Sequence, residues 1–581
     1  MLRSARGFSV RSCTRVSVVL LAMTLGATAT RAHEADDSTP VTRAALPPPT
    51  IGPGLDPAVP VPARRAGLLI AADAIRGHIE ILADDRFEGR ETGTPGYQLA
   101  ARYVAAQFRA LGLEPADSSG YLQPIAFRRY STVPSGCRLS ITRAGREVTF
   151  RYREHWLASA DPLREKWSVE APMVFAGHGI TAPEFGYDDY ANLDVTGKIV
   201  VLLSGAPKSF PADPRAHYSS GLVRDRNAAA HGAVGIVSVR TPADELRSPW
   251  ERSVRQADFS SMKWLDSGGA PTEVYPQLEF MARLSNAGGE LLFEGARRTL
   301  AQVYAASDSG RAQGFPLAGT LNGRRVSALS SAASSNVVGV LPGSDPRLRG
   351  EYVVVSAHLD HLGIGAPVAG DSIHNGAYDN ASGVAVMLEI ARALRAGNAR
   401  PKRSLVFVAL TGEEKGLQGS DYFAKHPSVG EGHLVANLNL DMALFLAPLR
   451  SVVVFGGEHS SLGPVYERAA RAADLEVSPD PAPEQVVFVR SDQYSFVKQG
   501  IPAAFPTAGS DGTDEGLERV REWRRTRYHS PQDDLNQNFD WPSAVRFARM
   551  NLFALWEVAN APAAPRWNAG DFFGDRFGTR K

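Results

Sequence analysis

The sequence predicts an α/β fold whose mixed, mostly parallel sheet is flanked by helices and carries an inserted β-rich domain. Apolar runs with little polar alternation, typical of strands buried on both faces of a parallel sheet, occur at 352–357, 404–410 and 436–440. Between the first two runs, residues 383–394 place apolar side chains at helical spacing, which indicates a βαβ unit. Short β-forming pieces separated by turns fill 128–318 instead.

The N-terminus has the pattern of an export signal. Basic residues precede an apolar stretch at 16–25, which is too short to span a bilayer, and small residues follow it. We therefore expect a signal peptide over 1–32, export to the periplasm or the extracellular space, and no membrane anchor after cleavage. A Pro-rich, unfolded linker is expected over 33–67. Since Cys13 would leave with the signal, Cys137 has no partner for an internal disulfide.

The rest of the chain divides by its local pattern. Residues 68–127 carry helical stripes around a glycine-punctuated loop and are assigned to the first part of the principal domain. The inserted domain is assigned to 128–318, and 319–560 complete the principal domain. Residues 561–581 form a C-terminal tail. The charge-dense stretch 509–527 is interpreted as a solvated loop, with a lid over the cleft as the alternative.

Composition and charge exclude several classes of protein. The chain is 44% hydrophobic and 22% charged, which is typical of globular proteins and excludes a disordered or fibrous chain. Lys+Arg 63 against Asp+Glu 62 leaves a net charge of +1. Neither nucleic acid nor a membrane surface is therefore an expected partner on electrostatic grounds.

Histidine and carboxylate residues follow the predicted strands or precede the predicted helix. They are His358, Asp360 and His361, then Asp379, then Glu413 and Glu414, then Asp441, and finally His529 and Asp533. Because residues beyond the carboxyl ends of neighbouring parallel strands line one crevice, these groups can converge. Imidazole and carboxylate ligands without thiolates suit Zn²⁺ or another divalent ion in a site open to water. Two histidines and three carboxylates suffice for two metals that share one carboxylate, with a further carboxylate as the general base.

The motifs around these residues resemble those of the M28 family of zinc exopeptidases, in the branch that carries an inserted protease-associated (PA) domain. The resemblance is carried by AHLDHLG at 357–363, NGAYDNASG at 375–383, GEE at 412–414, NLDM at 439–442 and YHSPQD at 528–533. It implies a zinc exopeptidase-like fold and a dinuclear centre with two Zn²⁺ per chain.

The resemblance also implies which residues bind the metals. His358 and Asp441 would bind one zinc, Glu414 and His529 the other, and Asp379 would bridge the two. The peptide bond that follows Asp379 would be cis.

Roles around the ligands follow from the same resemblance. Glu413 would be the general base, and Tyr528 would stabilise the oxyanion. Asp360 and Asp533 would hydrogen-bond the two ligand histidines and fix their orientation. His361 is expected to be structural rather than a metal ligand.

The resemblance implies peptide substrates and a secreted exopeptidase, with an aminopeptidase as the first interpretation. A carboxypeptidase of the same family stays open, since Arg90 or Arg490 could bind an α-carboxylate. A glutaminyl cyclase-like enzyme would use one metal, and a non-catalytic ectodomain would lack ligands; the presence of both His358 and Asp441 argues against each. A serine hydrolase would need a Gly-x-Ser-x-Gly elbow, which the sequence lacks. The side-chain preference and the oligomeric state stay open.

Overall fold

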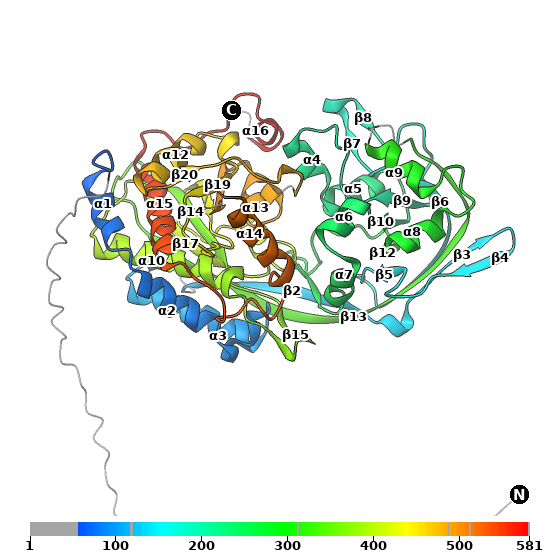
Figure 1. Ribbon diagram of the computed structural model, residues 1–581, viewed down its shortest axis with the longest axis horizontal. Helices are drawn as coiled ribbons and strands as arrows, with labels where there is room; N and C mark the ends of the chain where they lie inside the picture. Colours follow the sequence, from blue (N-terminus) through cyan, green and yellow to red (C-terminus); the bar gives the residue numbers. More distant parts are fainter. Residues whose placement is uncertain are drawn as a thin grey trace, which may run out of the picture. The chain divides into compact units, whose positions relative to one another are not determined.

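The computed structural model describes residues 56–116, 120–308, 310, 313–485, 487–509 and 513–578 (Figure 1). The expected signal peptide and most of the expected linker lie outside these residues. Within the described part of the chain, no helix is long and apolar enough to cross a bilayer.

The principal domain is built on parallel strands. Its main strands are β13 (Phe315–Leu341), β14 (Glu351–His358), β17 (Ser404–Leu410), β18 (His433–Asn439), β19 (Ser451–Phe455) and β21 (Ala503–Ala508). Strand β14 lies between β17 and β18 and is parallel to both, and β21 is parallel to β18. The second half of β13 runs antiparallel to β17, and β19 runs antiparallel to β21. The predicted mixed, mostly parallel α/β sheet is confirmed.

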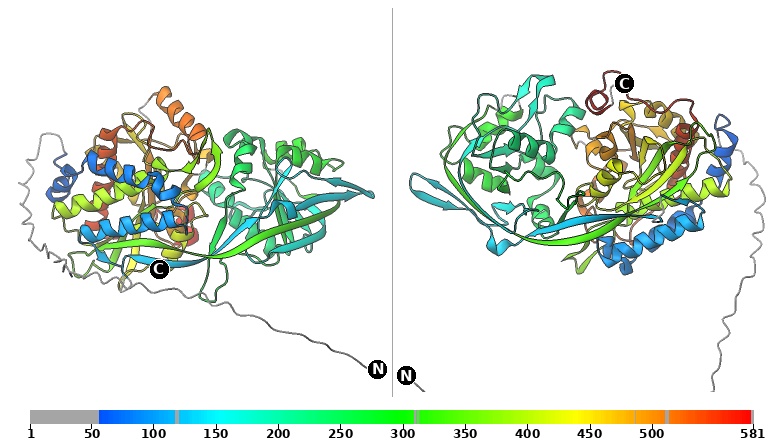
Figure 2. Two further views of the ribbon diagram at one scale, coloured as in Figure 1. Left: turned by 90° about the horizontal axis from the view of Figure 1, so that it is seen from below. Right: turned by 180° about the vertical axis from the view of Figure 1, so that it is seen from behind.

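Helices cover both faces of this sheet (Figure 2). Because side chains alternate along a strand, Val353 and Val355 face one core while Val354 faces another. The first core is formed with α1 (Val61–Leu68), α2 (Ala72–Leu82), α3 (Pro95–Ala110), α10 (Ser382–Ala396), α12 (Leu462–Ala472) and α15 (Trp541–Asn560). The second is formed with α11 (Gln418–Lys425) and α13 (Gln493–Val497). This two-sided burial explains why the strands read as continuous apolar runs.

A second sheet lies in the inserted module, which we define as residues 133–326. Its strands are β3 (Arg138–Arg143), β4 (Arg146–Thr149), β5 (Trp156–Ala158), β6 (Lys166–Phe175), β9 (Ile199–Leu203), β10 (Gly235–Val239) and β12 (Phe280–Leu284). Strands β6, β9, β10 and β12 are parallel neighbours in that order. The module also contains α4 (Ala212–Tyr218), α5 (Gly221–Ala230), α6 (Pro242–Arg247), α7 (Trp250–Gln256), α8 (Asn286–Phe293) and α9 (Leu300–Asp308). It is therefore richer in helix than the sequence suggested.

Strand β13 belongs to both sheets (Figure 1). It pairs with β6 as far as Val326, and from Ser327 to Val337 it pairs antiparallel with β2 (Leu122–Thr132). The boundary expected at 318–319 thus falls inside one strand of 27 residues, at a register shift between Leu317 and Thr320. The segment 327–335, where the strand passes from one sheet to the other, consists only of Ser, Ala and Leu, without Gly or Pro.

Three segments expected to lack regular structure contain helices. Helix α1 lies inside the expected linker, because Ala63 and Ala66 are buried and proline stands in its first turn, where a missing N–H costs little. Helix α14 (Asp514–Thr526) replaces the expected charged loop, because the Thr513 side chain caps it and Trp523 is buried. The expected tail contains α16 (Phe572–Phe577).

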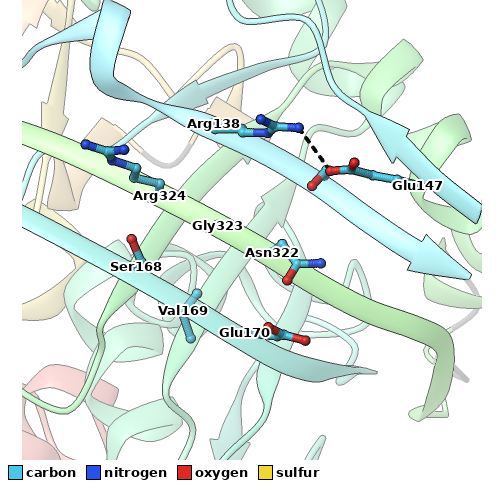
Figure 3. Close-up of a pocket in the computed structure, with 9 residues that line it drawn as sticks. Arg138, Glu147, Ser168, Val169, Glu170, Asn322, Gly323 and Arg324 are labelled. Atoms are coloured by element: carbon cyan, nitrogen blue, oxygen red, sulfur yellow. Dashed lines mark hydrogen bonds and ion pairs between the residues drawn. The ribbon is translucent and has the colours of Figure 1, made fainter. Parts of the chain in front are cut away.

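Shorter elements complete the described chain. They are β1 (Glu114–Pro115), β7 (Thr181–Ala182), β8 (Tyr187–Asp188), β11 (Ser261–Trp264), β15 (Gly363–Val368), β16 (Asp371–His374) and β20 (Glu476–Val477). A hollow of about 470 Å³ lies on the module sheet between β3, β6 and β13 (Figure 3). The Arg138–Glu147 ion pair, with 3.2 Å between Nη2 and Oε1, lies at this hollow, and none of the predicted metal ligands lines it.

Candidate metal centre

The predicted ligands converge at the carboxyl ends of the parallel strands. His358 is the last residue of β14, Glu414 follows β17 and Asp441 follows β18. Asp379 precedes α10, and His529 follows α14. Strand polarity therefore brings residues that are distant in sequence to one edge of the sheet, as the sequence predicted.

The ligand atoms fall into two groups joined by Asp379. His358 Nε2 lies 3.2 Å from Asp441 Oδ1 and 3.3 Å from Asp379 Oδ1. His529 Nε2 lies 3.2 Å from Glu414 Oε2 and 3.3 Å from Asp379 Oδ2. The two oxygens of one carboxylate thus face two separate histidines. This is the geometry that a bridging ligand requires.

His361 also belongs to the second group. Its Nδ1 lies 2.8 Å from Glu414 Oε1 and 3.9 Å from Asp379 Oδ2, and the imidazole is fully buried. The sequence analysis treated His361 as structural, but these atoms place it among the groups that can hold a metal ion. The signal was present in the sequence, since a second histidine follows three residues after His358 in the same strand-terminal segment.

Asp533 orients Asp379 through the main chain. Its Oδ1 accepts a hydrogen bond from Tyr378 N at 3.0 Å, and its Oδ2 accepts one from Asp379 N at 2.9 Å. The sequence analysis expected a bond from Asp533 to His529, and this was wrong because both carboxylate oxygens point to the segment before α10. The peptide bond between Asp379 and Asn380 is cis, as the resemblance implied.

Asp360 organises the loop after β17. Its carboxylate accepts hydrogen bonds from Glu413 N at 3.1 Å, Glu414 N at 3.3 Å and Thr92 Oγ1 at 2.9 Å. The contact with His358 Nδ1, at 3.0 Å, comes from the main-chain carbonyl of Asp360 rather than from its carboxylate. The expected orientation of His358 is therefore achieved by a different atom, and the carboxylate is free to hold the Glu413–Glu414 segment in place.

Two residues just before α13 lie beside Asp441 and the centre. Ser491 Oγ donates to Asp441 Oδ2 at 2.6 Å and accepts from Asn439 Nδ2 at 3.0 Å. Asp492 is fully buried beside the centre, and burial raises its pKa to about 7. Neither role was assigned from the sequence, because a serine or an aspartate in a loop carries no distinguishing spacing.

The pKa of Glu413 is shifted in the opposite direction from that of Asp379. Burial raises the pKa of Glu413 well above its usual range, and the charges of Glu414 and Asp441 add to that effect against the opposing charge of His358. Burial acts in the same direction on Asp379, but the adjacent histidines outweigh it and hold its pKa well below the usual range. Glu413 thus holds a proton more readily than Asp379 does.

The donor set fits two divalent cations. Several carboxylates lie buried within one small volume, where like charges repel unless cations compensate them. Two groups, His358 with Asp379 and Asp441 and His361 with Asp379 and Glu414, each bring three ligand atoms within 4.8 Å of one another. Nitrogen and oxygen donors without sulfur suit zinc in a site that stays open to water.

Tyr528 and Arg90 have clearly different surroundings. The Tyr528 ring stacks on His529 with ring centroids 3.9 Å apart, so it lies beside the centre. The Arg90 guanidinium is buried and donates to main-chain carbonyls, including Leu359 O at 2.9 Å and Gly376 O at 3.0 Å. Arg90 therefore holds loops together and does not bind a substrate carboxylate.

Sequence comparison finds a family match in the second half of the chain. Residues 336–555 match the model of peptidase family M28. A probable zinc metalloprotease of Pyrenophora tritici-repentis is 30% identical over 259 residues, which cover 40% of this chain and 58% of the relative. One of Pyricularia oryzae is 28% identical over 295 residues, which cover 45% and 57%. The chain thus spans less than two thirds of these relatives' length. The family match therefore concerns residues 336–555 alone.

Structural comparison covers more of the chain. The solved structure of an aminopeptidase from Aneurinibacillus sp. strain AM-1 matches with a TM-score of 0.53 and 20% sequence identity. The match covers 86% of this chain and 97% of that one. At this identity the likeness concerns the fold alone, which this chain shares with that structure over most of its length.

Proposed function

We propose that the chain is a dizinc exopeptidase that releases N-terminal residues from peptides. The proposal rests on the position of Asp379: one of its carboxylate oxygens faces His358 and the other faces His529. We assign His358 and Asp441 to one zinc, Glu414 and His529 to the other, and Asp379 to both. The likeness of fold to a solved aminopeptidase supports the choice of an aminopeptidase.

The residues of the centre have different roles in peptide hydrolysis. When bound, the zinc ions would supply Lewis acidity and lower the pKa of water. Glu413 takes a proton from the attacking water and passes it to the leaving amine. The Asp360 carboxylate accepts a hydrogen bond from the main-chain N–H of Glu413 and so holds Glu413 in position. Tyr528, beside His529, donates a hydrogen bond to the oxyanion that forms on the substrate carbonyl.

A carboxypeptidase is the second candidate, and one observation favours it. Arg490 lies close enough to Tyr528 to act on it electrostatically, and Arg252 and Arg524 both interact with Tyr528 as well. A cluster of guanidinium groups beside the centre could bind an α-carboxylate.

Substrates with one blocked end separate the two candidates. An aminopeptidase cleaves free aminoacyl anilides and not N-acetylated ones, and it tolerates a C-terminal amide. A carboxypeptidase cleaves N-acetylated peptides with a free C-terminus. Each assay is repeated after chelation and after zinc is added back, and activity that survives complete chelation would rule out the zinc mechanism.

We also propose export and a PA-type role for the inserted module. Cleavage after Ala32 would give a mature N-terminus at His33, which N-terminal sequencing of the secreted chain checks. Gln256, in α7 of the module, contacts His529 with 3.3 Å between Nε2 and Nδ1, so the module reaches the metal centre. We infer that it limits access to short peptides, and the relation between peptide length and kcat/KM tests this.

A further inference from the structure

A second group of metal-binding side chains lies outside the centre described above. His459 and Glu458 belong to the short helix η5 (Gly457–His459), which follows β19. Asp213 lies in α4 of the inserted module, and Asp571 caps the N-terminus of α16. Three segments that are far apart in sequence therefore meet at one imidazole.

The hydrogen bonds fix which ring nitrogen is available. His459 Nδ1 lies 2.6 Å from Asp571 Oδ2, so a proton on Nδ1 is donated to this carboxylate. Asp571 Oδ1 is already occupied, since it accepts from Gly574 N at 2.8 Å. This leaves His459 Nε2 with a free lone pair. A carboxylate that orients the opposite nitrogen is the usual partner of a metal-ligating histidine.

The free nitrogen is buried and faces two carboxylates. The His459 side chain is 2% exposed, and Nε2 is buried without a hydrogen-bond partner in the described part of the chain. Nε2 lies 3.5 Å from Asp213 Oδ1 and 3.8 Å from Glu458 Oε1. A buried polar atom without a partner is unfavourable, so this site is incomplete without a further group.

The spacing suits a cation better than direct hydrogen bonds. N–H···O hydrogen bonds have heavy-atom distances of about 2.7–3.2 Å, below both values. Two ligands each about 2.0–2.1 Å from a tetrahedral zinc are separated by roughly 3.3–3.4 Å. His459 Nε2 and Asp213 Oδ1 lie close to that spacing, and the Glu458 side chain, which is 61% exposed, can move towards it.

We propose that His459, Asp213 and Glu458 bind a third divalent transition-metal ion, zinc by the chemistry of the donor set, and that Asp571 positions the imidazole. Ca²⁺ and Mg²⁺ prefer an all-oxygen environment and fit less well. The ion would connect α4 of the module to η5 of the principal domain, next to α16 (Figure 1). This inference is independent of the proposed function, since no residue of the first centre takes part.

Zinc content and affinity test the proposal on the full chain. The first preparation is Asp379→Asn, which weakens the dinuclear centre, and zinc binding is measured by competition with a chromophoric chelator and by elemental analysis. Adding His459→Gln should remove one further equivalent of zinc per chain. Adding Asp571→Asn instead should retain the equivalent but weaken its affinity about 10–100-fold.

His217→Gln is the matched control. His217 lies in the same helix as Asp213 and is also buried, but it contacts Tyr494 Oη at 2.5 Å and the Phe572 ring rather than carboxylates. The substitution His217→Gln should therefore leave the zinc content unchanged. A loss of zinc in His217→Gln equal to that in His459→Gln would show that the effect is general disruption, and would overturn the proposal.

Thermal unfolding supplies a readout that does not depend on stoichiometry. In the Asp379→Asn chain, micromolar zinc should raise Tm, and this rise should disappear with His459→Gln. Equal zinc content with and without His459 would overturn the third site, as would binding only at millimolar zinc. Failure of the dinuclear assignment would instead leave the zinc content of the Asp379→Asn chain equal to that of the unsubstituted chain, whatever residue stands at position 459, so the two failures are distinguishable.

Discussion

Two buried histidines, one in each region of the molecule, have pKa values shifted in opposite directions. In the inserted module, His178 bonds to Ser307 Oγ at 2.7 Å, and burial lowers its pKa to about 4. In the principal domain, burial also disfavours the charged form of His529, but Glu414 and Asp379 outweigh it and raise its pKa to about 10. His358, beside Asp441, is shifted in the same direction.

The contrast shows that burial of a histidine does not by itself mark a site. At His178 one ring nitrogen bonds to a hydroxyl, and the imidazole is neutral. Carboxylates in excess of the histidines leave a negative charge that a cation must balance. The density of carboxylates around each imidazole therefore distinguishes a metal centre from a packed core.

Removal of the Asp379 carboxylate, the proposed bridge, should have the largest effect on the metal centre. We expect Asp379→Asn to lose zinc and to lower kcat/KM by more than the 10²–10⁴-fold typical of a missing general base, because both proposed zinc ions lose a ligand. Elemental analysis and anilide hydrolysis measure the two effects. Asp189→Asn, which removes a buried carboxylate of the module, is the control and should retain the zinc.

Replacing the proposed base should separate chemistry from metal binding. Glu413→Gln keeps the shape of the side chain but removes the group that accepts the proton. We expect kcat to fall about 10²–10⁴-fold with the zinc content unchanged. A fall of less than tenfold would mean that another group carries the proton, and Asp492, which is fully buried beside the centre, would be the next to test.

Sequence patterns predicted the sheet and the convergence of histidines and carboxylates at its edge, because strand burial and strand polarity are local properties with a fixed geometric consequence. The five proposed ligands were singled out by the resemblance to the M28 motifs. Helix α14 was missed because its charged residues dominate the pattern, although Trp523 anchors it. The partners of Asp360 and Asp533 were misassigned because a choice among nearby acceptors depends on loop conformation. His361 was undervalued although its place three residues after His358 was visible in the sequence, since only the structure shows its distance to Glu414.

Acid should weaken the contribution of His178 to the stability of the module. The folded module keeps His178 neutral, with a pKa of about 4, while an unfolded histidine takes a proton below about 6.5. The stability that His178 contributes is therefore unchanged above about pH 6.5 and falls by about 3 kcal/mol as the pH drops to about 4. His529 has the opposite shift, so its contribution is complete below about pH 6.5 and is lost as the pH rises towards 10.

Hydrogen exchange on the chelated chain, corrected for intrinsic rates, can follow both regions at once. Peptides around β9 should exchange faster at pH 5 than at pH 7, and those around β14 should not. His178→Gln should reduce the difference in exchange rate between pH 5 and pH 7 in the module. If both regions loosened together at pH 5, the histidines would not be the cause.

The smallest effects should come from residues that touch the ligands. Ser491→Ala removes a buried hydrogen bond to Asp441 and should weaken zinc binding about 10–100-fold. Gln256→Ala removes an exposed contact from the module to His529, which water can replace, so we expect less than a tenfold loss. Ser495→Ala, whose hydroxyl contacts Ser420 at 2.9 Å, is the control for a buried serine and should leave zinc affinity unchanged. A larger loss for Gln256→Ala than for Ser491→Ala would mean that the module, rather than the strand ends, sets the geometry of the centre.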